Sequence, residues 1–146
     1  MKNIFVLIGV IFFSMTSLSF AAEIEVKMLN KNEDGEKMVF EPSMIIANVG
    51  DTVTFLPTEK GHMAASIKGM IPEGVESFKG KTNKTISYEI TAEGLYGVRC
   101  TPHYANGMVA IIVVGSNHDA EAFLSGKKVS KKAKMRFEEM LANLPQ

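Results

Sequence analysis

The feature that most constrains the fold is a series of short segments in which apolar and polar residues alternate. Residues 23–30 (EIEVKMLN), 84–91 (KTISYEIT) and 95–100 (LYGVRC) each place every second side chain on one apolar face. Residues 108–114 (MVAIIVV) form a continuous apolar run, which is typical of a well-buried strand. Because turn-forming residues separate these segments, we predict an all-β antiparallel sandwich or barrel whose strands extend to about residue 115.

The C-terminal segment, residues 117–144, has a different composition, rich in Ala, Lys, Glu and Leu. Its pattern predicts a short helix over Asp119–Leu124, ended by Gly126, and a longer helix from about Ser130. An apolar stripe at helical spacing predicts that the second helix packs on the sandwich; its members are Ala133, Phe137, Met140, Leu141 and Leu144. The fold class is therefore a β-sandwich with two C-terminal α-helices. Residues 69–83 have no clear period and are loop-like.

The N-terminus has the layout of a secretory signal peptide. Lys2 precedes the apolar run IFVLIGVIFF and the small-residue segment SMTSLSFAA. We predict a signal peptide over residues 1–22, with cleavage after Ala21 or Ala22, and a single domain over 23–146. The alternative is a membrane anchor, but the run must extend to Phe20 to approach the length that crosses a bilayer.

Charge and cysteine content narrow the function of the exported domain. The chain has 16 Lys and Arg and 16 Asp and Glu, so removal of Lys2 leaves 15 basic against 16 acidic side chains. Nucleic-acid-binding proteins normally carry an excess of basic residues, so this balance argues against that class of protein. Cys100 is the only cysteine and has no partner within the chain for a disulfide. In an exported protein it must be buried, paired with another chain, or used in chemistry.

The segment RCTPHYANGM, residues 99–108, places a thiol, an imidazole and a thioether within nine residues. Pro102 prevents the strand from continuing, and Gly107 permits a backbone conformation that most residues avoid. We therefore expect a tight loop that turns His103 and Met108 back toward Cys100.

A second imidazole would complete a metal site. His62 lies at the edge of a predicted strand, 38 residues before Cys100, and a sandwich could bring it to the same end as the loop. His118 lies near a predicted helix start, where we expect it to be exposed. Two imidazoles and a thiolate with a weak thioether are the ligands of a mononuclear blue-copper site.

Cys100 has three other possible interpretations. Zinc is disfavoured because a thioether is a poor zinc ligand. A Cys–His nucleophile of a thiol hydrolase would leave His62 and Met108 without a role. A buried free cysteine can also be a small hydrophobic residue.

Several motifs resemble a known family, the cupredoxins, and within it the pseudoazurin branch. They are EVKMLN, MVFEPSMI, GDTVTF, KGH, MIPEG, CTPHYANGM and the two-helix tail, and they cover essentially all of the exported chain. The Cys-x2-His-x4-Met loop is shared with plastocyanin, so MIPEG and the tail favour pseudoazurin. The resemblance implies a Greek-key sandwich of about eight strands. It also implies one copper ion bound through His62, Cys100, His103 and Met108.

The resemblance also implies a periplasmic one-electron carrier that cycles Cu(II) and Cu(I) and is not an enzyme. Its partners would be redox proteins such as copper nitrite reductase or a c-type cytochrome. The carrier would be a monomer that binds them transiently through electrostatic docking. A periplasmic copper chaperone or scavenger is the alternative. The implied docking surface has an apolar part, Met38, Pro57 and Pro102, and a basic part, Lys60, Lys79 and Arg99.

Two positions depart from the family pattern. Met63 follows the first predicted ligand, where the family usually has an Asn that ties the ligand loops together. We therefore expect an altered reduction potential or a looser site. Asn106 stands in the ligand loop where relatives often have a hydrophobic residue, which changes the expected composition of the apolar docking patch.

Overall fold

The structure is a computed structural model that describes residues 20–116 and 118–145. Residues 1–19, which carry most of the predicted signal peptide, lie outside the described part. The elements in chain order are β1 (Glu23–Lys31), β2 (Lys37–Glu41), β3 (Met44–Ala47), β4 (Thr52–Leu56), β5 (Ala65–Ser66), β6 (Ile86–Glu89), β7 (Gly94–Arg99), the 3-10 helix η1 (Thr101–Asn106), β8 (Val109–Val114), α1 (Ala120–Leu124) and α2 (Lys131–Ala142). The eight strands and two terminal α-helices confirm the predicted fold class.

The strands form two four-stranded sheets, in the orders β2-β1-β4-β6 and β3-β8-β7-β5. The sandwich is as predicted, but the expectation of antiparallel pairing is wrong for two pairs, because β1 pairs with β4 and β3 pairs with β8 in parallel. These neighbours are not consecutive in sequence, as a Greek-key sandwich requires. An alternating pattern has a period of two in either direction of pairing, so it could not distinguish them.

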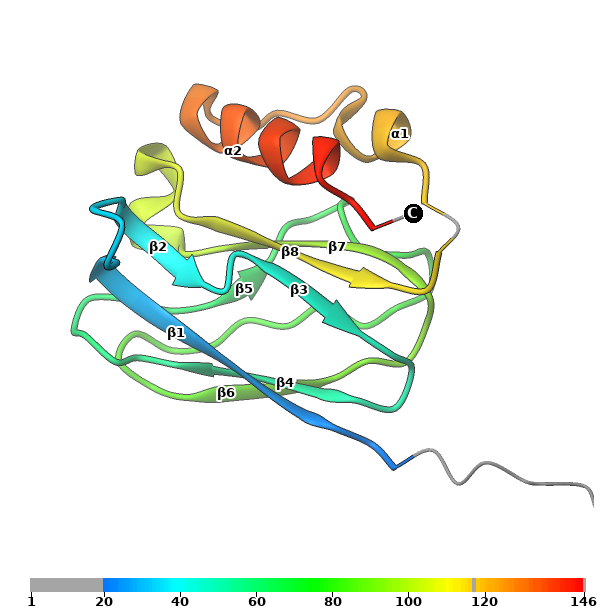
Figure 1. Ribbon diagram of the computed structural model, residues 1–146, viewed down its shortest axis with the longest axis horizontal. Coiled ribbons are helices and arrows are strands. Elements are labelled where there is room, and N and C mark those ends of the chain that lie inside the picture. The colour runs from blue at the N-terminus through cyan, green and yellow to red at the C-terminus, as the bar shows by residue number, and fades with distance from the viewer. Residues whose placement is uncertain (1–19, 117, 146) are drawn as a thin grey trace, which may run out of the picture.

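Strand β8 lies between two hydrophobic layers, and all six of its residues are buried. Ala110, Ile112 and Val114 face the core between the two sheets. Val109, Ile111 and Val113 face the opposite side, where they pack with residues of α1 and α2. Figure 1 shows the two helices covering this outer face of the second sheet. The continuous apolar run is therefore explained by burial on both faces.

Both predicted helices begin at capping residues. The side chain of Asp119 accepts a hydrogen bond from the Ala122 amide at 2.8 Å, and Ser130 Oγ accepts one from the Ala133 amide at 3.2 Å. These bonds satisfy backbone donors that the first helical turn leaves free. The predicted apolar stripe packs as expected, with Ala133, Phe137 and Met140 buried and Leu141 and Leu144 half-buried. Among the described residues, none of the helices has the length and apolar character needed to cross a membrane.

Residues 69–83 form no named strand, in agreement with their loop-like sequence, and Lys79 makes a single bridge to Ala65. The next strand along the chain, β6, returns to pair with β4.

Candidate metal centre

The ligand loop folds back on itself directly after β7. The His103 amide donates to the Cys100 carbonyl at 3.1 Å, and the Met108 amide donates to the His103 carbonyl at 3.1 Å. The Cys100 amide then donates to the Met108 carbonyl at 2.9 Å, which places the two ends of the loop side by side. Pro102 lies in the first turn of η1, and Gly107 ends it at a φ of 84°, a conformation that favours glycine. The predicted tight loop is confirmed.

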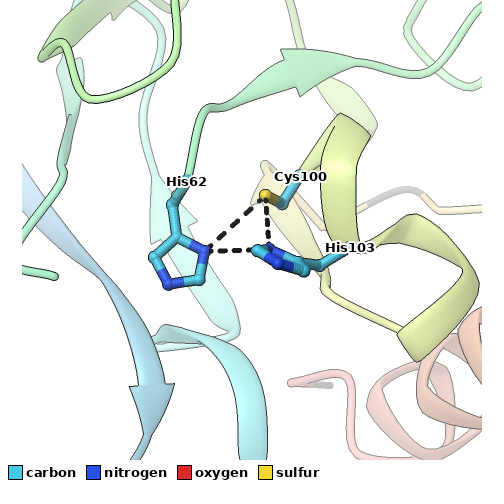
Figure 2. A group of neighbouring side chains, drawn as sticks. All are labelled: His62, Cys100 and His103. Carbon is cyan, nitrogen blue, oxygen red and sulfur yellow. Dashed lines mark hydrogen bonds between the residues drawn. The ribbon is translucent and has the colours of Figure 1, made fainter. Parts of the chain in front are cut away.

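Three donor atoms converge from this loop and from the segment between β4 and β5. The Sγ of Cys100 lies 3.8 Å from Nδ1 of His62 and 3.6 Å from Nδ1 of His103. The two Nδ1 atoms are 3.2 Å apart (Figure 2). As expected for a sandwich, His62 reaches the same end of the fold as the loop. No other group of three His, Cys, Asp or Glu side chains in the described residues converges in this way.

The remaining ring nitrogen of His62 is held from outside the cluster. Its Nε2 lies 3.0 Å from Oδ1 of Asn30, an acceptor, so Nε2 carries the proton and Nδ1 presents a lone pair toward Cys100. The His62 carbonyl accepts from the Asn83 amide at 2.9 Å, and Oδ1 of Asn83 accepts from the Gly61 amide at 2.6 Å. Asn30 and Asn83 have no local signal in the sequence, because both contacts depend on distant segments meeting in the fold.

Burial affects both of the inner donors. It raises the pKa of the Cys100 thiol, while hydrogen bonds from the backbone amides of Met63 and His103 oppose that shift. It also lowers the pKa of His62, and the neighbouring His103 lowers it further, against the attraction of Glu59. A lowered pKa favours the neutral imidazole of His62, the state in which it can bind a metal. A thiol of raised pKa must lose its proton on binding.

Met108 is fully buried and lies between Gly107 and the first residue of β8, Val109. Its backbone is bonded to both Cys100 and His103, so the thioether belongs to a residue fixed beside two of the three convergent donors. The Met63 side chain is buried as well, and the backbone contact of this residue to Cys100 is present although the family's Asn is absent.

The predicted docking residues differ in exposure. Lys60, Lys79 and Pro102 are exposed, whereas Met38, Pro57 and Arg99 are half-buried. Arg99 and Lys79 line the same hollow together with Lys68. The Arg99 guanidinium lies 5.3 Å from the centre of the Tyr104 ring, which limits its freedom. Asn106 is exposed and lines a second hollow with Met38.

His118 takes no part in the cluster. It is half-buried rather than exposed as predicted, because its Nε2 is hydrogen-bonded at 2.7 Å to the Gly115 carbonyl.

The donor chemistry of this end of the sandwich fits copper. Two imidazole nitrogens and one thiol sulfur converge, and a thioether residue is fixed beside them. A single cysteine with a thioether is the soft, mixed donor set of copper electron-transfer proteins rather than the multi-cysteine set of structural zinc.

Comparisons with known proteins agree with this chemistry. Residues 26–115 match the family model "Copper binding proteins, plastocyanin/azurin family". A pseudoazurin of Paracoccus pantotrophus is 47% identical over 133 residues, which cover 91% of this chain and 89% of the relative.

Two solved pseudoazurin structures have the same fold. That of Methylobacterium extorquens AM1 superposes with a TM-score of 0.78 at 40% identity, covering 84% of this chain and 99% of the other. That of Hyphomicrobium denitrificans gives 0.79 at 38% identity, covering 85% and 99%. The chain therefore belongs to the plastocyanin/azurin family of copper-binding proteins and, within it, to the pseudoazurins, which are type 1 copper electron carriers and not enzymes.

Proposed function

We propose that this chain is a periplasmic one-electron carrier that binds one copper ion through His62, Cys100, His103 and Met108. The observation that carries the proposal is the convergence of two Nδ1 atoms and one Sγ within 4.8 Å of one another. Bound copper supplies a one-electron couple between Cu(II) and Cu(I). The chain supplies a fixed set of donors acceptable to both states, so little rearrangement accompanies electron transfer.

The donors have different roles because their surroundings differ. His62 and Cys100 are fully buried and hold the metal from inside the sandwich. Met108, equally buried, would bind the copper weakly through its thioether and so tune the reduction potential. His103 is half-buried in a loop at the surface, so its ring is the path by which an electron leaves or enters.

The docking surface is proposed to surround His103. Its apolar part is Met38, Pro57 and Pro102, and its basic part is Lys60, Lys79 and Arg99. Such a surface suits acidic periplasmic partners such as copper nitrite reductase or a c-type cytochrome. Charge attraction accelerates encounter, and a small interface lets a monomeric carrier leave quickly.

Electron transfer to a c-type cytochrome, followed by stopped-flow absorbance at low and high ionic strength, tests the carrier role. We expect fast reversible exchange that slows with salt, and a slower reaction for Lys60→Glu and Lys79→Glu. Lys128→Glu is the matched control, because Lys128 is an exposed lysine between α1 and α2. Tight copper binding without electron exchange would instead favour the chaperone or scavenger.

Export is proposed through a signal peptide that lies within residues 1–22 and is cleaved after Ala21 or Ala22, and local contacts favour cleavage after Ala21. The Ala22 amide nitrogen donates to Oδ1 of buried Asp51 at 2.8 Å, and the Ala22 carbonyl accepts from the Thr52 amide at 2.8 Å. Loss of Ala22 would leave the Asp51 carboxylate without this donor and the Thr52 amide without this acceptor. Cleavage after Ala21 instead places the new N-terminal ammonium group beside the Asp51 carboxylate. The mass of the periplasmic protein tests this choice: a chain that begins at Glu23 would contradict it.

A further inference from the structure

One cationic side chain on α2 is bonded to two segments that meet near the metal centre. Nη1 of Arg136 donates to the Met38 carbonyl and to the Gly107 carbonyl, both at 2.7 Å. Its Nη2 donates to the Lys37 carbonyl at 2.9 Å. Met38 and Gly107 are far apart in sequence, so Arg136 joins the start of β2 to the end of the ligand loop.

One of the two segments has an unusual backbone conformation. Met38 has a φ of 53°, which is rare for a residue other than glycine, whereas the φ of 84° at Gly107 is readily adopted by glycine. A left-handed conformation at a residue such as Met38 persists only where the surroundings enforce it. The Arg136 guanidinium is part of those surroundings, because it bonds the Met38 carbonyl as well as the Gly107 carbonyl.

Other contacts show that α2 supports the whole ligand loop. Ser130 Oγ donates to the Tyr104 carbonyl at 2.9 Å, near the middle of η1. A Cβ at Gly107 would lie 2.9 Å from Cβ of Lys132, so the loop and the helix are in direct contact at this glycine. The helix therefore holds the loop at two points, and Arg136 extends this hold to Met38.

The bonds of Arg136 require a guanidinium. Within the part of the chain that the structure describes, the only ion pair joins Lys134 to Glu138, so Arg136 is held by carbonyl groups rather than by a carboxylate. Three acceptors in different directions suit the rigid fork of arginine, whereas a lysine ammonium offers one point charge on a flexible chain.

From these contacts we propose that Arg136 is a positioning residue that fixes the Met108 end of the ligand loop relative to Met38. The inference rests on the proposed function, because it assigns a purpose to loop rigidity in an electron carrier. A loop fixed at Gly107 keeps the next residue, Met108, in one place beside Cys100 in both oxidation states. Arg136 does not touch the metal donors and acts through the backbone.

The test compares Arg136→Lys and Arg136→Gln with Lys134→Gln, a change of an exposed residue on the same helix. Amide hydrogen exchange is measured by NMR on the Cu(I)-loaded and metal-free proteins. The reporters are the Gly107 and Met108 amides, which donate to Tyr104 and His103, and Ile112 in the centre of β8. The reduction potential of each copper-loaded protein is measured in parallel.

We expect exchange at Gly107 and Met108 to become at least about tenfold faster in both Arg136 variants, with Ile112 unchanged. We expect the potential to shift in both variants and to stay at the wild-type value in Lys134→Gln. Because Arg136→Lys retains the charge, a shift in that variant reports loop position rather than lost charge.

Unchanged exchange at Gly107 and Met108, or a wild-type potential in both Arg136 variants, would overturn the proposal. Faster exchange at all three reporters would also overturn it, since it would show a general loss of stability. A chain that binds no copper would refute the proposed function. The metal-free exchange data would then still decide whether Arg136 fixes the loop.

Discussion

The two histidines of the metal centre occupy contrasting surroundings. His62 is fully buried, and both its ring and its backbone are bonded to neighbouring segments through Asn30 and Asn83. His103 is half-buried, and it lies in a 3-10 helix whose φ and ψ at this residue depart from helical values. One imidazole is built into the sandwich, and the other belongs to a surface loop.

This difference shows how one site can both hold a metal and exchange electrons. Buried, hydrogen-bonded ligands fix the geometry of the donors. An imidazole at the surface gives a partner protein a short route to the metal without opening the site to solvent. Because the two histidines differ in burial, we expect substitutions of each to have different effects on the metal centre.

The largest expected difference comes from removing each imidazole. In His103→Gly, added imidazole should restore the blue Cu(II) absorption, because the space left behind opens toward the surface. In His62→Gly, restoration should fail or be far weaker, because the space is enclosed by the sandwich and lacks access. Visible absorption during an imidazole titration measures both. Equal recovery in the two variants would show that burial does not separate their roles.

A smaller effect is expected from the bond that orients His62. Asn30→Ala removes the acceptor of the Nε2 proton, and we expect copper affinity to fall by about 10- to 100-fold. Competition with a chelator of known affinity measures the loss. Asn30→Asp retains an acceptor and serves as the matched control. An Asn30→Ala protein with wild-type affinity would contradict the orienting role of this bond.

The smallest effect is expected at Met63. Met63→Asn introduces the side chain that relatives usually have, while its backbone contact to Cys100 is retained. A new hydrogen bond is worth about 1 kcal/mol, and for a one-electron couple about 1.4 kcal/mol corresponds to about 59 mV, so we expect a shift of about 40 mV. Potentiometry measures it. An unchanged potential and spectrum would remove the idea that Met63 tunes this site.

Much of the centre could be predicted from sequence because it is local. Cys100, His103 and Met108 lie in one short loop, and Pro102 and Gly107 indicate where that loop must turn. His62 could be included only by inferring that the fold brings the ends of distant strands to the same end of the sandwich.

The remaining features depend on register and on contacts between distant segments. Arg136 lies 98 residues from Met38, and Asn30 lies 32 residues from His62, so no local pattern connects them. The parallel pairings of β1 with β4 and of β3 with β8 were missed for the same reason. Periodicity indicates which side of a strand is buried, but it does not identify the neighbouring strand.

The central claim is that a thiolate and two imidazoles of this chain bind copper as a type 1 site. The most direct measurement is the visible absorption spectrum of the purified protein after one equivalent of Cu(II), with Cys100→Ser measured alongside. We predict an intense blue band that ascorbate removes and that the Cys100→Ser protein lacks. A colourless protein whose thiol remains freely titratable would contradict the claim.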